Sequence, residues 1–128
     1  MHGTGRLVAV VGPSGAGKDT LLAGARAALA GDASVRFVRR AITRPANAGG
    51  EDHRALTEAE FAAELAAGGF ALHWEAHGLR YGIPRGIKTD LAAGRVVVAN
   101  LSRAVLAEAE ARYPLLVLEV TAPPAVLA

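Results

Sequence analysis

The segment GPSGAGKDT, residues 12–20, has the residue types and spacing of a loop that binds phosphate groups. Such loops follow the pattern Gly, four residues, Gly, Lys, and then Ser or Thr. Glycines let successive backbone N–H groups turn inward around an anion, and the lysine adds a mobile positive charge. Lys18 is therefore a candidate catalytic residue that follows a transferred phosphoryl group. The residues expected to surround the phosphates are Gly12, Pro13, Ser14, Gly15, Ala16, Gly17, Lys18, Asp19 and Thr20.

The loop departs from the pattern at Asp19, which stands where a hydroxyl residue is usual. In one interpretation, Asp19 only favours the positive end of a helix dipole and binds no ligand. In a second, Thr20 supplies the missing hydroxyl; we disfavour this because one helical residue turns the side chain by about 100°. In the third, the Asp19 carboxylate holds Mg²⁺, directly or through water, because Mg²⁺ prefers hard oxygen ligands. We favour the third interpretation, which makes Asp19 the candidate metal ligand.

The residues on either side of the loop predict the elements that position it. Residues 7–11 form a continuous apolar run rich in β-branched residues, as expected for a strand buried on both faces of a parallel sheet. After the glycines, a helix is expected to begin at about Gly17. Its apolar positions fall on one face, and they are Leu21, Leu22, Ala25, Ala28 and Leu29. A strand, a glycine loop and a helix in this order are the setting that a phosphate loop requires.

The rest of the chain alternates between predicted strands and helices. A strand is expected at residues 35–38, buried strands at 95–100 and 115–120, and a helical stretch at residues 102–112. Residues 57–69 predict a helix in which Thr57 and Glu60 form a capping box. Residues 70–78 and 79–84 read as a hairpin-like excursion. This alternation predicts an α/β fold in three layers, with a mostly parallel sheet between helices and with ligands at the carboxyl ends of the strands.

Composition limits the protein class. A chain of 128 residues with 52% hydrophobic residues is long enough for one domain with a core, and no second composition zone divides it. The absence of cysteine excludes disulfides and thiolate metal sites and fits a cytoplasmic location. The net charge is +2 and the basic residues are spread along the chain, so no nucleic acid partner is indicated. No apolar run near the N-terminus is long enough for a membrane span, and we expect no membrane partner.

In order along the chain, GPSGAGKDT, TRP (residues 43–45), GGEDH (49–53), RYGIP (80–84) and VVVAN (96–100) resemble the guanylate kinase family. The resemblance covers nearly the whole chain and implies a P-loop kinase domain over residues 1–128. It also implies an insertion at about residues 40–84 that binds the phosphoryl acceptor. Arg44, Glu51 and Tyr81 fall on the acceptor-binding positions of that family, and Arg44 would act in catalysis.

Departures from guanylate kinases point to an acceptor that lacks guanine. Positions where that family reads the base with carboxylates correspond to His73 and Asn100, while Arg40, Arg80 and Arg103 are additional arginines. Losing the carboxylates that accept from guanine discriminates strongly against it, and arginines suit phosphate groups. With GKD, EDH and N-x-S-R (residues 100–103), the chain is most similar to the ribose 1,5-bisphosphate phosphokinases of phosphonate breakdown. The expected acceptor-binding residues are Arg40, Arg44, Glu51, Asp52, His53, Tyr81, Asn100 and Arg103.

The resemblance implies that ATP and Mg²⁺ are used to convert ribose 1,5-bisphosphate into 5-phosphoribosyl 1-diphosphate. Two alternatives are a guanylate or other nucleoside monophosphate kinase, and a non-catalytic binding module of the same fold. A binding module would have no use for Lys18 or for the glycines of the loop. Kinases of this family continue into an arginine-bearing lid, a further strand and a closing helix, which we expect to be lacking here. On that expectation the 128-residue form is a poor catalyst, and an exposed sheet edge favours its self-association.

Overall fold

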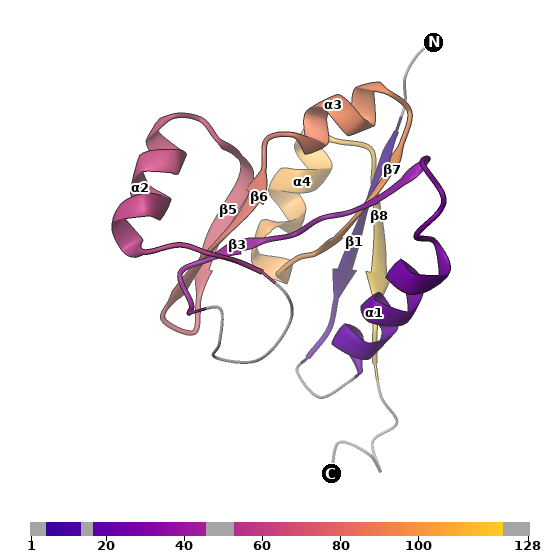
Figure 1. The fold of residues 1–128 in the computed structure, drawn as a ribbon, viewed down its shortest axis with the longest axis horizontal. Helices are drawn as coiled ribbons and strands as arrows, with labels where there is room; N and C mark the ends of the chain where they lie inside the picture. The colour runs from indigo at the N-terminus through magenta and orange to yellow at the C-terminus, as the bar shows by residue number, and fades with distance from the viewer. Residues whose placement is uncertain (1–4, 14–16, 46–52, 122–128) are drawn as a thin grey trace.

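A computed structural model describes residues 5–13, 17–45 and 53–121, and in it two β-sheets share one hydrophobic core. Figure 1 shows the first sheet on the right, between helices, and the second on the left. The core combines side chains of both sheets, among them Leu7 and Val97 from the first and Leu72 and Ile83 from the second. Each of these four side chains is fully buried. The two sheets are therefore held together by shared apolar packing.

The first sheet consists of four parallel strands in the order β2-β7-β1-β8. Their bounds are β1 Arg6–Val11, β2 Val35–Phe37, β7 Val96–Asn100 and β8 Leu115–Glu119. β1 lies between β7 and β8, with Leu7 paired to Val97 on one side and to Leu115 on the other. This central place explains why its apolar run is buried. Because the strands are parallel, their carboxyl ends meet at one edge, at the bottom of the sheet in Figure 1.

The second sheet has the order β4-β3-β6-β5 and is mostly antiparallel. Its strands are β3 Ala41–Ile42, β4 Arg54–Ala55, β5 Phe70–Ala76 and β6 Leu79–Pro84. β5 and β6 form the predicted hairpin, which turns at His77 and Gly78 with positive φ angles of 57° and 75°. Helix α2, Glu58–Ala66, covers this sheet with the buried ring of Phe61. The capping box of Thr57 and Glu60 is present, as predicted.

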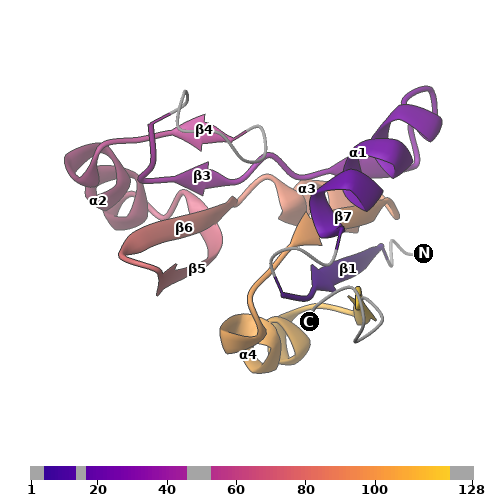
Figure 2. The ribbon, with the colours of Figure 1, turned by 90° about the horizontal axis from the view of Figure 1, so that it is seen from below.

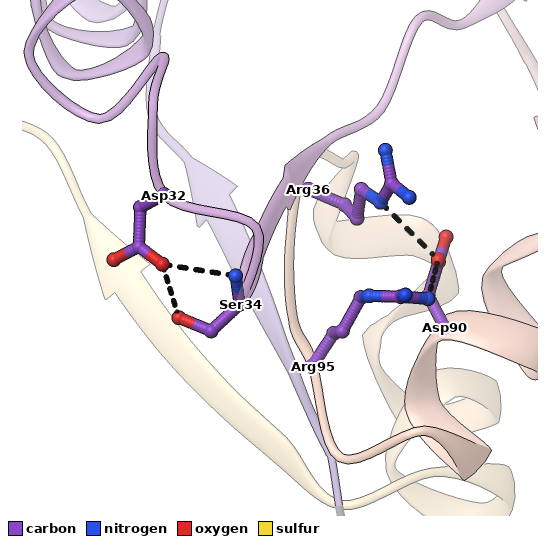
Figure 3. A network of polar contacts seen from close by, with 5 residues as sticks. All are labelled: Asp32, Ser34, Arg36, Asp90 and Arg95. Carbon is purple, nitrogen blue, oxygen red and sulfur yellow. Dashed lines mark hydrogen bonds and ion pairs between the residues drawn. The ribbon is translucent and has the colours of Figure 1, made fainter.

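The remaining helices flank the parallel sheet. Helix α1, Lys18–Ala28, and helix α4, Leu106–Arg112, lie on opposite sides of it (Figure 2), which gives the expected layers. A 3-10 turn, Arg103–Val105, leads into α4, and helix α3, Ile87–Ala92, precedes β7. The Asp90 carboxylate of α3 joins Arg36 at 3.4 Å and Arg95 at 3.0 Å, which ties α3 to β2 and to the start of β7 (Figure 3). No helix in the described ranges is long and apolar enough to cross a membrane.

A short turn between α1 and β2 is closed by the Asp32 carboxylate. It accepts hydrogen bonds from the Ser34 hydroxyl at 2.5 Å and from the Ser34 backbone N–H at 2.9 Å (Figure 3). These two hydrogen bonds favour the ionised carboxylate and hold the pKa of Asp32 below its ordinary value of 3.8. The turn aligns the chain for entry into β2.

One sequence prediction about burial is wrong. β8 was expected to be a buried strand, but Leu116, Val117 and Leu118 are 49%, 44% and 46% exposed. The reason is its place at the end of the sheet, where β1 is its one partner among the described strands. Helix α1 forms where expected, but none of its residues is buried, and Leu21 is 47% exposed. An apolar pattern predicts that a face is suited to packing, whereas its burial depends on a neighbouring element.

Candidate functional site

A cavity of about 850 Å³ lies beside the carboxyl ends of the parallel strands and is also lined by strands of the second sheet. Its walls bring together segments that are far apart in the sequence. The predicted site residues that line it are Gly12, Pro13, Gly17, Lys18, Asp19, Thr20, Arg40, Arg44, Tyr81, Asn100 and Arg103. The loop expected to bind phosphates and the arginines expected to bind the acceptor therefore face one space.

The first glycine of the loop begins directly after β1. Gly12 has a φ of 154°, and a Cβ atom there would lie 2.3 Å from the carbonyl oxygen of Val120. A side chain at this position would thus collide with the backbone that follows β8. β8 and the loop are joined at the same point by a 2.8 Å hydrogen bond from the Val120 N–H to the Val11 carbonyl. Only glycine fits here without moving one of the two segments.

Helix α1 starts at Lys18, directly after the last glycine of the loop. Gly17 caps it in the left-handed conformation, with φ 88° and ψ 15°, and supplies no side chain to bond the first N–H groups. These groups and the positive end of the helix dipole favour an anion. The Lys18 Nζ donates a 2.9 Å hydrogen bond to the Gly12 carbonyl, which places the ammonium group across the opening of the loop. Positive charge is therefore concentrated where phosphates are expected to bind.

Asp19 and Thr20 both line the cavity and both are exposed. Thr20 therefore faces the same space as Asp19, one residue further along α1. The exposed carboxylate of Asp19 is chemically suited to Mg²⁺, since it is a hard oxygen donor next to a phosphate loop. Across the three described ranges, no group of three or more His, Asp or Glu side chains is arranged to hold a metal ion. Phosphates and water are suited to complete the coordination of a metal at Asp19.

Opposite the loop, Arg40 forms part of a compact aromatic and cationic wall. The rings of Trp74 and Tyr81 stack with centroids 5.3 Å apart and planes 4° apart. The Arg40 guanidinium lies 5.0 Å from the Tyr81 ring centroid and 5.9 Å from that of Trp74. Its Nη1 also donates a 3.3 Å hydrogen bond to the Asn100 carbonyl at the end of β7. Arg40 is thereby held at the junction of the two sheets.

Arg44 reaches the cavity from the segment that follows β3. The His53 ring is buried, and its Nε2–H donates a 2.9 Å hydrogen bond to the Arg44 backbone carbonyl. His53, which was expected to bind the acceptor, is not part of the cavity wall. Its position instead fixes the backbone that presents the Arg44 side chain. Residue types alone could not show this, because the burial of His53 is a property of the folded structure.

Arg103 lines the cavity from the turn after β7, and its guanidinium contacts the Glu119 carboxylate at the end of β8. Arg80, an additional arginine in the sequence comparison, does not line the cavity. Its guanidinium stacks on the Phe61 ring, 4.7 Å from the centroid, and its Nη1 lies 3.9 Å from the Glu58 carboxylate. Arg80 therefore packs on α2. The predicted residues Ser14, Gly15, Ala16, Glu51 and Asp52 lie outside the described residues.

On β5, Trp74 lines the cavity and His73 does not. Successive side chains of a strand point to opposite faces. Trp74 pairs with Tyr81 across the hairpin and lines the cavity, whereas His73 is exposed and is absent from the wall. Sequence reasoning also missed Ile42 and Ala76, which line the cavity from β3 and β5. Alternation along β5 puts His73 and Trp74 on opposite faces, but which of them faces the cavity depends on the pairing of β5 with β6.

The fold matches that of a solved guanylate kinase. The crystal structure of guanylate kinase from Anaplasma phagocytophilum aligns with a TM-score of 0.74 over 93% of this chain and 62% of that chain. The sequence identity is 17%, so the likeness shows the fold. The predicted guanylate-kinase-like α/β fold is confirmed. No protein-family model matches the chain.

Two curated relatives are much more similar in sequence. A bifunctional ribose 1,5-bisphosphokinase-thymidine phosphorylase of Azorhizobium caulinodans is 58% identical over 127 residues, which are 98% of this chain and 18% of that protein. The ribose 1,5-bisphosphate phosphokinase PhnN of Methylobacterium radiotolerans is 55% identical over 125 residues, which are 97% of this chain and 70% of the relative. This degree of identity over most of a relative's length is decisive for the family. The chain belongs to the ribose 1,5-bisphosphate phosphokinase family.

Proposed function

We propose that the chain carries the phosphate-binding and acceptor-binding part of a kinase that uses ATP to phosphorylate ribose 1,5-bisphosphate. The products are 5-phosphoribosyl 1-diphosphate and ADP. The observation that carries this proposal is the single cavity onto which the phosphate loop and the three arginines Arg40, Arg44 and Arg103 all open. Its volume of about 850 Å³ is suited to two phosphorylated ligands placed side by side.

The chemistry asks little of the side chains beyond alignment and charge. An oxygen of the acceptor's 1-phosphate attacks the γ-phosphorus of ATP, a new P–O bond forms, and the bond to the β-phosphate oxygen breaks as ADP leaves. The attacking oxygen is already ionised near neutral pH, so no general base is required. Lys18 on one side, with Arg44 and Arg103 on the other, would neutralise the charge that builds up between the two ligands.

Mg²⁺ fits the loop side of the cavity. The Asp19 carboxylate would hold the ion, directly or through water, and the ion would neutralise charge on the nucleotide phosphates. Asp19 is exposed on the cavity wall next to Lys18, so the carboxylate is accessible to such a ligand. A carboxylate without an ion at this position would repel phosphates, which makes the pairing of Asp19 with a cation the consistent interpretation.

The names of the relatives support the acceptor assignment. The Methylobacterium protein is named a ribose 1,5-bisphosphate phosphokinase, and the chain spans 70% of its length, whereas it spans 18% of the bifunctional Azorhizobium protein. The wall around Arg40 and Trp74 supports the same assignment, because it offers cationic and aromatic groups and no carboxylate from the described residues. An acceptor made of sugar and phosphate suits such a wall.

The test is a panel of acceptors with ATP and Mg²⁺, in which ribose 1,5-bisphosphate is compared with GMP, AMP and CMP. The panel is run with the 128-residue chain and with a version extended by the remaining C-terminal segment of the Methylobacterium relative. We expect kcat/KM to be far higher for ribose 1,5-bisphosphate than for any nucleotide. Turnover of GMP as fast as, or faster than, that of ribose 1,5-bisphosphate would contradict the assignment. Tight ATP binding without transfer to any acceptor, in both versions, would favour the non-catalytic binding module.

A further inference from the structure

Trp74 occupies a fixed place in the acceptor side of the cavity. Its side chain is 8% exposed and belongs to the core cluster that includes Leu72 and Ile83. One face of the indole is stacked on Tyr81, its partner across the β5–β6 hairpin. The Arg40 guanidinium, itself 9% exposed, lies within 6 Å of both ring centroids. Core packing, the aromatic stack and a cation therefore all hold the indole where it is.

The chemistry of this wall is poorly suited to a nucleobase. Bases with N–H edges are recognised by acceptors such as carboxylates, and the one carboxylate lining the described cavity, that of Asp19, is on the loop side. A flat ring of about the size of a base already fills the position opposite Tyr81. The Arg40 guanidinium lines the cavity and attracts phosphate oxygens. A sugar phosphate can lie along this surface, whereas a nucleotide needs additional room for its base.

We propose that Trp74 is the specificity-determining residue of the acceptor site: its indole fills the compartment that a base would require and so selects acceptors that have a sugar and phosphates but no base. The inference rests on the proposed function and deepens it. The indole excludes a base because it occupies the volume that the base would need and because its packing is rigid. Removing the indole should therefore admit nucleoside monophosphates, even though no new hydrogen-bonding group is introduced.

The experiment compares Trp74→Leu with the unchanged chain, using calorimetric binding of ribose 1,5-bisphosphate, GMP and AMP, and using kcat/KM in the C-terminally extended version. We expect the preference for ribose 1,5-bisphosphate over the nucleotides to fall roughly tenfold or more, the range that pocket volume changes produce. Phe61→Leu is the matched control, because Phe61 is fully buried in an aromatic stack but lies outside the cavity wall. Its acceptor preference should not change. An unchanged preference in Trp74→Leu, or equal loss of all acceptors, overturns the role of Trp74.

A second measurement does not depend on the stability of a variant. Trp74 is the single tryptophan of the chain, so intrinsic emission reports on this wall alone. Ribose 1,5-bisphosphate should alter the emission and shield it from a soluble quencher, whereas ATP alone should leave it nearly unchanged. Saturating ribose 1,5-bisphosphate without any change in emission or shielding would contradict the inference. The proposed function fails separately, if the unchanged chain in its extended version prefers GMP to ribose 1,5-bisphosphate as acceptor.

Discussion

The guanidinium of Arg103 and the carboxylate of Glu119 form an ion pair that spans the carboxyl end of β1. Arg103 follows β7, Glu119 ends β8, and β1 runs between these two strands into the phosphate loop. The two side chains are 59% and 50% exposed, and ion pairs this exposed contribute little to stability. Because Arg103 also lines the cavity, Glu119 and a phosphate group would compete for the same guanidinium.

The first prediction concerns this competition. Glu119→Gln should tighten acceptor binding by no more than about fivefold, the upper limit for an exposed pair, without lowering the melting temperature. Arg103→Ala should weaken acceptor binding and leave ATP binding nearly unchanged. Both are measured by calorimetry at low and at high salt. Glu108→Gln is the control, because Glu108 pairs with Arg112 in an exposed ion pair outside the cavity. Weaker acceptor binding in Glu119→Gln would contradict the competition.

The second prediction concerns the unusual Asp19. If its carboxylate holds Mg²⁺, Asp19→Ala should lower turnover roughly 100-fold or more and raise the Mg²⁺ concentration needed for half-maximal rate. Asp19→Ser should keep part of the activity, since Ser is the usual residue of such loops. The measurement is a Mg²⁺ titration of the initial rate in the extended version.

Glu110→Ala serves as the control for that titration, because Glu110 is exposed on α4 and does not line the cavity. Circular dichroism should show the same fold for all three variants, since an exposed Asp19 contributes nothing to the core. If the Mg²⁺ titration of Asp19→Ala matches that of the unchanged chain, Asp19 is a helix-end charge and no metal ligand.

The third prediction concerns Arg44. Arg44→Ala should weaken the binding of ribose 1,5-bisphosphate roughly 10- to 100-fold, because hydrogen bonds to charged groups contribute about 1.5–3 kcal/mol. ATP binding should change much less, since the nucleotide phosphates face the loop. Calorimetry with each ligand alone gives both values. Arg54→Ala is the matched control, because Arg54 is an exposed arginine of the same segment that pairs with Glu64 instead of lining the cavity. Equal loss of both ligands in Arg44→Ala would argue for a general structural role.

The fourth prediction concerns the exposed apolar side chains of β8. Three successive apolar side chains, those of Leu116, Val117 and Leu118, are between 44% and 49% exposed on a strand at the end of the sheet. Such a strand is a template for pairing with another chain. The 128-residue form should therefore self-associate with rising concentration, as measured by sedimentation velocity. Val117→Lys should reduce this association, whereas Lys88→Ala on α3 should not. A strictly monomeric chain at all concentrations would refute the prediction.

The sequence was sufficient for the elements whose signals are local. The glycine loop between β1 and α1, the capping box of Thr57 and the β5–β6 turn each depend on residues a few positions apart. The burial of β8 and the orientation of Trp74 were not predictable in this way. Burial depends on which element lies next to a strand, and orientation depends on the hairpin register, where one residue of shift exchanges the two faces.

The site was predictable to a similar extent. The loop pattern identified Lys18, whereas Arg44 came from the resemblance to the guanylate kinase family and Arg40 and Arg103 from departures from that family. The expected acceptor-binding residues included Arg103 and left out Arg80, which stacks on Phe61. Residue types did not show that the His53 ring bonds the Arg44 backbone, because that contact joins two different segments of the fold.

The cavity has walls from both sheets, and this ties folding to binding. A ligand that contacts both the loop and Arg40 bridges the two sheets. It can bind in this way only when the two sheets are packed on each other. Any such ligand adds to the free energy of unfolding, by about 2.7 kcal/mol when its concentration is 100 times its dissociation constant. The concentration of substrate would thus affect the free energy of unfolding of the chain as well as its rate of turnover. When the sugar phosphate is scarce, a larger fraction of the chain would be unfolded and open to proteolysis, although no catalytic group has changed.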